Sequence, residues 1–338
     1  MLEHLHATPT APVRAVVLGS RGFIGAALTK RLGAEGIDYL PVSSAEIDLA
    51  AAGATDRLAS LLRPDDALVM LSALTPDKGR DIGTTLRNLE MGRTVVEAIG
   101  RSPVAHVVYI SSDAVYPFGE GRVSEESPAA PIDLYGTMHR AREIMLRQAT
   151  TAPVAVLRPT LVYGATDTHN SYGPSRFRRQ AAKDGIIPLG GEGEETRDHI
   201  LVDDAVELIL RVLTRRSAGL LNLVSGRSIS FSDLARLVAV QFDAPVEIRH
   251  IPRTQPATFR AFDTTACAKA FPDFSATPLE VGIARTHCEA MGPLELRECR
   301  PPIRTHSMPF RRGSGPDDDP GLKVSATAAR LEIIRYEE

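Results

Sequence analysis

Tyr135 and His139 are the two residues of this chain whose types and spacing point most directly to chemistry. They lie four positions apart, so one helical turn would place both side chains on the same face. Ser112 precedes them, just after an apolar run that ends at Ile110. A tyrosine and a serine hydroxyl beside a histidine can exchange protons with a substrate oxygen. Together with a glycine turn nearer the N-terminus, they predict redox chemistry on a carbon that bears a hydroxyl or carbonyl group.

The glycine turn follows the first apolar run, residues 13–18, and precedes a helical pattern that continues to Leu32. A strand before such a turn and a helix after it form the context that dinucleotide binding requires. Gly19 permits the tight turn, Gly22 lets the backbone approach a pyrophosphate, and Gly25 lets helix and strand pack closely. The helix N-terminus then offers N–H groups to the phosphates. The predicted cofactor contacts of this turn are Gly19, Arg21, Gly22, Phe23, Ile24 and Gly25.

The choice of nicotinamide cofactor depends on the end of the second predicted strand, residues 37–42. An acidic residue there would hold the ribose 2′-hydroxyl of NAD. Ser43 follows instead, without a charge to repel a 2′-phosphate, and Arg21 could bind that phosphate with its fork of donors. Asp48 is expected to contact adenine or to cap the next turn. We therefore predict NADP, with NAD as the alternative if Arg21 is a solvated loop residue.

Short apolar runs alternate with helical patterns through most of the chain, which predicts a parallel sheet covered by helices on both faces. The expected strands are residues 13–18, 37–42, 67–72, 105–110, 154–157 and 221–224. The expected helices are residues 22–32, 84–99, 135–148, 202–213 and 231–240. We therefore predict an α/β fold, with a Rossmann-type doubly wound parallel sheet and a smaller C-terminal substrate-binding lobe.

The predicted domains follow from where this alternation weakens. Residues 12–165 form the expected dinucleotide-binding domain, and residues 166–290 form the expected substrate-binding lobe, with segments that return to the sheet. The pattern is loose over residues 161–193, which are rich in glycine, proline and polar residues. Residues 291–338 contain too few apolar positions to build a core, so we expect a flexible extension there.

Composition excludes several classes of protein. A formal net charge of -3 lacks the electrostatic footprint of nucleic-acid binding. Cys267, Cys288 and Cys299 form neither a Cys-x-x-Cys motif nor a cluster with histidine, so we expect no disulfide framework and no metal site. No run approaches 18 apolar residues, and the N-terminus lacks the apolar core of a signal peptide. We therefore expect a cytoplasmic protein with neither a membrane nor a nucleic acid as partner.

Over residues 13–283 the chain resembles the extended short-chain dehydrogenase/reductase family, in its NAD-dependent epimerase/dehydratase branch. The resemblance rests on blocks that occur in the family's order, none of them sufficient alone. They are the glycine turn, Ser111-Ser112 before Val115-Tyr116, Tyr135, Leu157-Arg158-Pro159, Val162-Tyr163-Gly164, Arg197-Asp198 and Asn222-Leu223. The glycine turn is similar to that of NADPH-dependent 4-keto-sugar epimerase-reductases. The resemblance implies a homodimeric enzyme that acts on a nucleotide-activated sugar or another small carbonyl or hydroxyl substrate.

In that family a tyrosine exchanges a proton with the substrate oxygen, which a serine polarises, and Tyr135 and Ser112 match these residues. A phenol with a pKa near 10 is a poor base at pH 7, so a lysine four residues on normally stabilises its ionised form. Here His139 takes that position, while Arg140 and Arg142 are expected to point to other helix faces. The resemblance implies a working site with an altered relay, in which His139 bonds the nicotinamide ribose. A weak site and a non-catalytic dinucleotide-binding sensor or scaffold are the alternatives.

The substrate side of the predicted site depends on the same resemblance. Sugar dehydratases carry an aspartate and then a glutamate after the serine, whereas this chain has Asp113 and Ala114. Water elimination would lack its base, so 4-keto reduction or epimerisation through a keto intermediate is the predicted reaction. Arg197 matches the arginine that binds the diphosphate of a nucleotide sugar. Asn170 and Asp113 are the further predicted substrate contacts.

Overall fold

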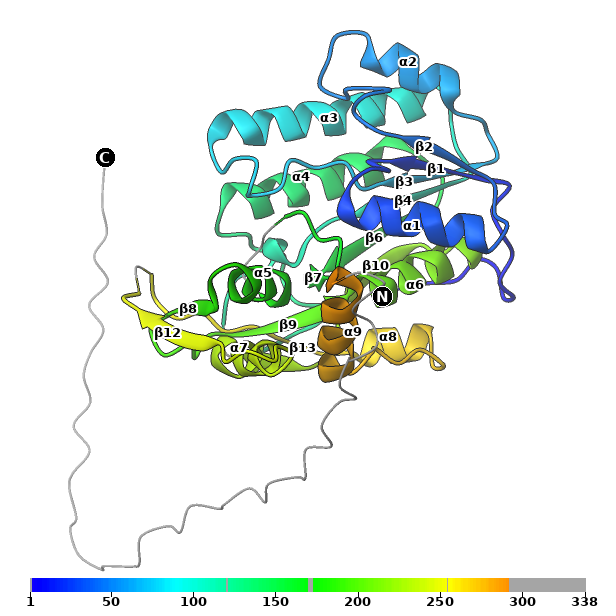
Figure 1. Cartoon of the computed structure of the whole chain (residues 1–338). Helices are drawn as coiled ribbons and strands as arrows, with labels where there is room; N and C mark the ends of the chain where they lie inside the picture. Colours follow the sequence, from blue (N-terminus) through cyan, green and yellow to red (C-terminus); the bar gives the residue numbers. More distant parts are fainter. Residues whose placement is uncertain (1, 120, 170–172, 254, 292–338) are drawn as a thin grey trace, which may run out of the picture. The chain divides into compact units, whose positions relative to one another are not determined.

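Six parallel strands form the central sheet of the computed structural model, which describes residues 2–119, 121–169, 173–253 and 255–291 (Figure 1). The strands are β1 (Arg14–Leu18), β2 (Tyr39–Val42), β3 (Asp66–Met70), β4 (His106–Ile110), β6 (Val154–Pro159) and β10 (Gly219–Leu223). Their order is β10-β6-β4-β3-β1-β2, and Val17 lies beside Pro41 of β2 and Val69 of β3. The chain leaves β1 toward one edge and continues from β3 toward the other. Ligands of such sheets bind at this switch point, outside the carboxyl ends of the strands.

Helices cover both faces of this sheet. They are α1 (Phe23–Ala34), α2 (Ala54–Leu61), α3 (Ile82–Arg101), α4 (Leu134–Ala149) and α6 (Val202–Thr214). Ala15 and Val17 pack toward α1 and α6, whereas Val16 and Leu18 pack toward α2, α3 and α4. Because both faces are covered, every residue of β1, β3 and β4 is buried. The predicted α/β fold is confirmed, and the predicted strands and helices are present with shifted ends. The sequence analysis missed α2.

Most of the remaining elements form a second, smaller core, and the others pack in the main core or in a small separate cluster. The strands are β5 (Arg122–Val123), β7 (Leu161–Tyr163), β8 (Ile186–Gly190), β9 (Thr196–Leu201), β11 (Ser228–Ser230), β12 (Glu247–Ile251) and β13 (Ala261–Phe262). The helices are α5 (Pro174–Asp184), α7 (Phe231–Ala239), α8 (Thr265–Ala270) and α9 (Leu279–Met291), besides the 3-10 turn η1 (Asp113–Val115). Phe177, Ile187 and Leu234 pack together between α5, β8 and α7. The stretch 161–193 is therefore more regular than its glycine and proline content predicts, because short elements there share this core.

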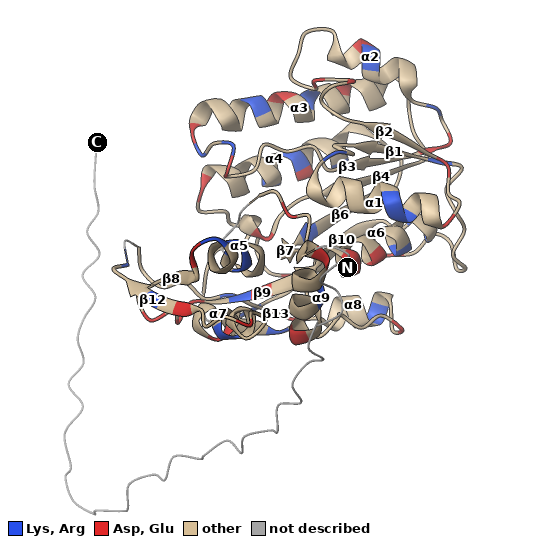
Figure 2. Ribbon diagram, viewed as in Figure 1, with Lys and Arg blue, Asp and Glu red and all other residues tan. Residues whose placement is uncertain are grey.

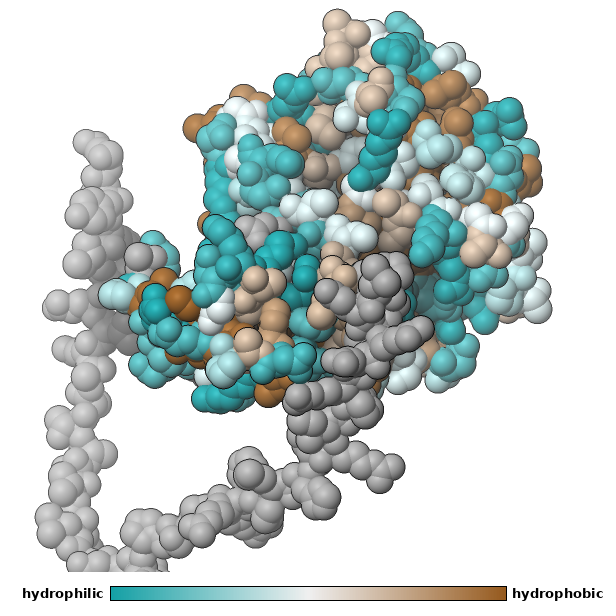
Figure 3. Space-filling view, in the orientation of Figure 1, coloured by the Kyte–Doolittle hydropathy of each residue, from teal (hydrophilic) through white to brown (hydrophobic). Residues whose placement is uncertain are grey.

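Charged residues of both signs are interspersed along the outer helices (Figure 2). On the face shown in Figure 3, hydrophobic residues lie in small patches among hydrophilic ones. Of the helices in the described ranges, none is both long and apolar enough to cross a membrane. Cys267 is a free, buried thiol.

Glu143 fixes α4 to the sheet through a buried ionic contact. It accepts hydrogen bonds from Arg158 of β6 through Nε (2.8 Å) and Nη2 (2.6 Å), and from the Ser111 hydroxyl (2.6 Å). Neither Glu143 nor Arg158 is more than 2% exposed. Burial alone would raise the pKa of Glu143, but the bonds from Arg158 and Ser111 lower it below its ordinary value. The second half of α4 is thereby held against the carboxyl ends of β4 and β6.

Glu143→Gln is expected to lower the free energy of unfolding by about 3–5 kcal/mol at pH 7, because it leaves the Arg158 charge buried without a partner. Since the pKa of Glu143 is lowered in the folded state, its stabilisation is complete above the unfolded value of 4.5 and declines below it. Denaturant titrations of the natural chain and of Glu143→Gln, from neutral to acid pH, would measure the difference between their free energies of unfolding. This difference should decrease as the pH falls. Glu90→Gln, which removes an exposed pair with Arg93, is the control. Equal stability of Glu143→Gln and the natural chain would contradict the assignment.

Candidate active site

The glycine turn forms a cradle at the carboxyl end of β1. Gly19 has a φ of +89°, in the left-handed region that favours glycine, and the Gly22 amide donates to its carbonyl (3.0 Å). A Cβ on Gly25 would overlap the Gly19 carbonyl oxygen, so only glycine lets α1 pack this closely. Phe23 and Ile24 lie in the first turn of α1, where backbone N–H groups lack intrahelical acceptors. The turn therefore has the form that the sequence predicts for binding a pyrophosphate.

The carboxylate of Glu46, a residue beyond β2, folds back to the end of that strand. Its carboxylate accepts hydrogen bonds from the amide (2.8 Å) and hydroxyl of Ser43, and these bonds lower the pKa of Glu46. Arg21, whose side chain is 74% exposed, lies 3.3 Å from the same carboxylate. The sequence analysis missed Glu46 because it considered only the residues directly after the strand. Asp48 accepts from the Ala50 amide (3.0 Å) and from Arg87 (2.8 Å), so the turn-capping alternative describes this residue.

Tyr135 and Ser112 are brought together where α4 meets η1. Asp133 caps α4 by accepting from the Gly136 amide (2.7 Å), which places Tyr135 in the first turn. A Cβ on Gly136 would overlap the Ala114 carbonyl, so the helix start lies tightly against η1. Burial raises the pKa of Tyr135, and Tyr109 adds to this, while Arg142 and a hydrogen bond with Ser112 lower it. A substrate oxygen beside this pair would meet two hydroxyl groups.

His139 is buried one turn further along α4. Its ring packs edge-on against Tyr135, with ring centroids 4.6 Å apart, and Nδ1 shares a hydrogen bond of 2.7 Å with the Tyr109 hydroxyl. Nε2 is buried without a partner among the described residues. Burial lowers the pKa of His139 well below its ordinary value, and Arg142 lowers it further. The histidine is therefore neutral at physiological pH and supplies no positive charge.

Arg142 corrects the sequence analysis. It was expected on another face of the helix, but it lies on the same side of α4 as Tyr135 and is 0% exposed. Two helical turns, seven residues, bring side chains back to one face. The guanidinium donates to the carbonyls of Ser72 (2.8 Å) and Asn88 (2.8 Å). Ser72 lies against the glycine turn, since a Cβ on Gly19 would be 3.0 Å from the Ser72 amide nitrogen. The bond from Arg142 to Ser72 therefore also links α4 to that turn.

Two arginines converge on the substrate side of η1. Arg260 pairs with Asp113 (2.9 Å) and donates to the Tyr116 carbonyl (2.6 Å). Its guanidinium carbon lies 4.2 Å from the centre of the Phe118 ring, and that of Arg197 lies 4.5 Å from the same centre. Asp113 is thus held by an arginine that the sequence analysis missed. Asn170 lies outside the described residues.

Arg197 keeps its charge without an acidic partner in the part of the chain that is described. It donates to the carbonyls of Thr196 (2.8 Å) and Thr258 (2.7 Å), which are both neutral. Burial lowers the pKa of Arg197 and Arg260 lowers it further, whereas the charges of Glu195 and Asp113 raise it. A partly buried cation of this kind is suited to an anionic ligand.

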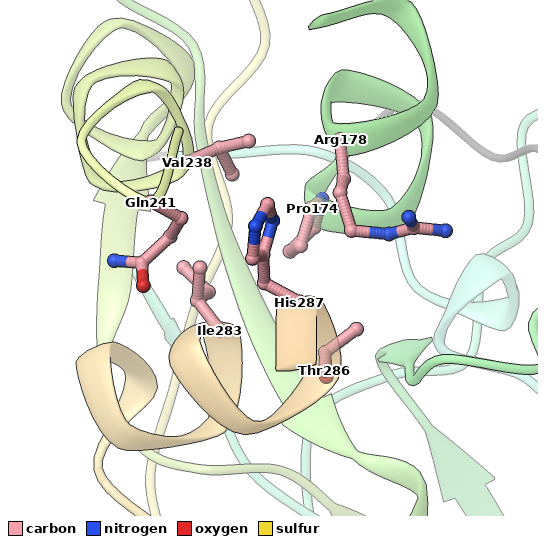
Figure 4. Close-up of a pocket in the computed structure, with 7 residues that line it drawn as sticks. All are labelled: Pro174, Arg178, Val238, Gln241, Ile283, Thr286 and His287. Carbon is pink, nitrogen blue, oxygen red and sulfur yellow. The ribbon is translucent and has the colours of Figure 1, made fainter. Parts of the chain in front are cut away.

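A small hollow lies away from these residues, between α5, α7 and α9 (Figure 4). Its lining residues are Pro174, Arg178, Val238, Gln241, Ile283, Thr286 and His287. None of the predicted site residues lines it. Within the described ranges, no cluster of three or more His, Cys, Asp or Glu side chains could hold a metal ion.

A model of the NAD dependent epimerase/dehydratase family matches residues 15–223. The dTDP-L-rhamnose 4-epimerase of Burkholderia thailandensis is 29% identical over 297 residues, which cover 68% of this chain and 81% of that protein. The dTDP-4-dehydro-6-deoxy-D-allose reductase of Streptomyces bikiniensis is 33% identical over 140 residues, which cover 39% of this chain and 42% of that protein. The crystal structure of Thermus thermophilus UDP-glucose 4-epimerase in complex with NAD has a TM-score of 0.74 and 20% identity, covering 82% of this chain and 99% of that one.

The His139 side chain is expected to remain neutral from about pH 8 to pH 6, because burial opposes its protonation. Nitrogen-15 NMR of histidine-labelled protein would follow the ring, with the signal assigned by its loss in His139→Gln. A titration of that signal near pH 6.5, the ordinary range for histidine, would contradict the description of this site.

Proposed function

The chain belongs to the NAD-dependent epimerase/dehydratase family, an enzyme family, and we propose that it epimerises a nucleotide-activated hexose at C4 through a keto intermediate. The observation that carries the proposal is the position of Tyr135 in the first turn of α4, which lies tightly against η1 and its capping residue Ser112, near the buried Arg142. Tyr135 would take the proton of the sugar hydroxyl and return it. Ser112 would donate to the same oxygen. Dehydratases of the family place a glutamate where this chain has Ala114, and Asp113 is paired with Arg260, so water elimination would lack a free carboxylate.

The residues present fit a nicotinamide dinucleotide. A Cβ on Gly25 would overlap the Gly19 carbonyl, so the turn brings the N-terminus of α1 close to β1 as pyrophosphate binding requires, and Nε2 of His139, buried without a partner among the described residues, is available to a ribose hydroxyl. A bound nicotinamide would supply acceptance and return of the hydride. The residues that would hold the cofactor are Gly19, Arg21, Gly22, Phe23, Ile24, Gly25, Ser43, Tyr135 and His139.

We propose NAD rather than the NADP that the sequence favours. The preference for NADP rested on the lack of an acidic residue after β2, and Glu46 now stands there against Ser43. Its carboxylate would accept from a ribose hydroxyl and repel a 2′-phosphate. Arg21, the expected phosphate ligand, lies against the same carboxylate. The solved 4-epimerase of similar fold is in complex with NAD.

For the substrate, we propose that Arg197 binds the diphosphate of the nucleotide sugar. The hydrogen-bond acceptors of this arginine among the described residues are neutral, and a guanidinium fork suits phosphate oxygens. The related proteins are named for dTDP and UDP sugars, so both nucleotides are candidates. Asp113 would act on the substrate through Arg260 rather than as a free acid.

Reduction of a 4-keto sugar is the second candidate. The similarity to the allose reductase and the form of the glycine turn favour it. A reductase consumes reduced cofactor in proportion to product, whereas an epimerase shows no net change, so absorbance at 340 nm separates the two.

A homodimer and a cytoplasmic location complete the proposal. Ile82 and Leu86 of α3 and Ile144 of α4 are between 42% and 67% exposed, and the two helices pack side by side (Figure 1). Exposed apolar residues on adjacent helices are suited to an interface between subunits.

Tyr135→Phe is expected to lower kcat by about 10²–10⁴-fold, because it removes the hydroxyl that would exchange the substrate proton. Cofactor binding, followed by the rise in melting temperature with NADH, should persist. Product analysis by chromatography of the nucleotide sugars would measure turnover. Tyr39→Phe, a change at a distant tyrosine of β2, is the control. Unchanged turnover in Tyr135→Phe would refute the proposed role.

NADH is expected to raise the melting temperature more than NADPH at equal concentration, because the Glu46 carboxylate disfavours a 2′-phosphate. Glu46→Gln should narrow this difference. Glu35→Gln, which removes an exposed pair with Arg31, should leave it unchanged. A larger rise in melting temperature with NADPH than with NADH in the natural chain would contradict the proposal of NAD and favour NADP, as the sequence predicts.

A further inference from the structure

Arg142 is a fully buried cation at the junction of α3, α4 and the segment after β3. Nη1 donates to the Ser72 carbonyl (2.8 Å), Nε and Nη2 donate to the Asn88 carbonyl (2.8 Å from Nε), and Nη2 lies 3.3 Å from Asn88 Oδ1. All these acceptors are neutral. No carboxylate within the described ranges forms an ion pair with Arg142. A buried charge without an opposite charge is unfavourable, so its presence here calls for a reason.

The groups beside Arg142 that can become negative are phenols. Tyr135 lies two helical turns before Arg142 on the same face of α4, and the charge of Arg142 acts on the ionisation of Tyr135 and of Tyr109 of β4. Tyr109 also shares a hydrogen bond with His139, whose ring packs against Tyr135 with centroids 4.6 Å apart, so the histidine lies between the two phenols. Of these groups, Tyr135 is the one that also contacts Ser112.

We propose that Arg142 is a positioning residue whose charge stabilises the ionised phenol of Tyr135, so that this chain works without a lysine at position 139. The inference rests on the proposed role of Tyr135 as proton donor and acceptor. His139, which is neutral, then contributes hydrogen bonds alone. The two duties of a single lysine, charge and ribose contact, are divided between Arg142 and His139.

The space for this arginine is made by Gly92 of α3. A Cβ at that position would lie 3.0 Å from Arg142 Cγ and 3.3 Å from Nε. Arginine is longer than lysine and keeps its charge when buried, so it can act from two turns away on the helix. Asn88, four residues before Gly92, accepts from the guanidinium through its carbonyl and side-chain oxygen, so α3 both admits and orients the charge.

Other charged groups also act on these phenols. Tyr109 and Asp113 raise the pKa of Tyr135, whereas Arg142 and the bond with Ser112 lower it. Glu143 on α4 raises the pKa of Tyr109. His139 carries no charge. Among these groups Arg142 is the positive one, so its removal should raise the pKa of Tyr135 through loss of charge.

The test follows ionisation at position 135 itself, in the full-length chain and without substrate. Replacing Tyr135 by 3,5-difluorotyrosine gives a more acidic phenol, and its fluorine-19 NMR shift reports ionisation over a pH range in which the fold persists. Arg142→Met removes the charge and keeps much of the side-chain length. Arg142→Lys keeps the charge and loses the fork that bonds Ser72 and Asn88.

Arg142→Met is expected to raise the apparent pKa of the labelled phenol by about 1–3 units, the usual effect of a nearby opposite charge, whereas Arg142→Lys should leave it close to that of the natural chain. The double change His139→Lys with Arg142→Met should restore the phenol pKa of the natural chain. If Arg142→Met alone does not fold, this double variant is measured in its place. In turnover assays of the unlabelled Arg142→Met variant, the pH profile should shift to higher pH by as much as the phenol pKa measured by fluorine-19 NMR.

Two outcomes would overturn the proposal. One is an unchanged phenol pKa in Arg142→Met, which would leave the arginine a structural strut between α3 and α4. The other is an equal rise in Arg142→Lys and Arg142→Met, which would attribute the effect to lost hydrogen bonds. Because the NMR titration needs no substrate, a wrong assignment of the sugar would stop turnover without changing this result.

Discussion

The burial of the Arg142 guanidinium is the constraint on which the centre of this molecule depends. Satisfying its donors fixes the segment after β3, through the Ser72 carbonyl, against α3, through Asn88. The next residue on α4, Glu143, points its own buried charge to Arg158 of the sheet. The helix that carries Tyr135 is therefore anchored on two sides, by the hydrogen bonds of Arg142 and by the buried ion pair of Glu143 with Arg158. A phenol held this firmly can be tuned by neighbouring charges.

Local patterns predict much of this fold and part of the site. β1, β3 and β4 are continuous apolar runs, and such runs predict strands that are covered on both faces. The glycine turn could be predicted because its spacing reflects a backbone constraint, seen in the overlap that a Cβ on Gly25 would cause. Ser112 and Tyr135 could be paired because family blocks occur in order. For the strands and the glycine turn, the information lies within a few neighbouring residues.

The features that the sequence did not predict arise from contacts between distant segments. Arg260 lies 147 residues from Asp113, and no local pattern indicates their ion pair. Glu46 folds back onto Ser43 from beyond the strand, so its charge reaches a place where the sequence shows only serines. Arg142 could have been found, since seven residues after Tyr135 is two turns of helix. Its significance becomes clear only from its burial without a carboxylate.

The measurement that tests this account most directly is the turnover of His139→Lys beside that of the natural chain, with dTDP- and UDP-activated hexoses at pH 7. If Arg142 already supplies the positive charge, a lysine at position 139 should bring no gain in kcat. A rise of about tenfold or more, the effect of one pKa unit on the fraction of ionised phenol, would contradict the account. Such a rise would mean that the natural chain lacks the charge its tyrosine needs.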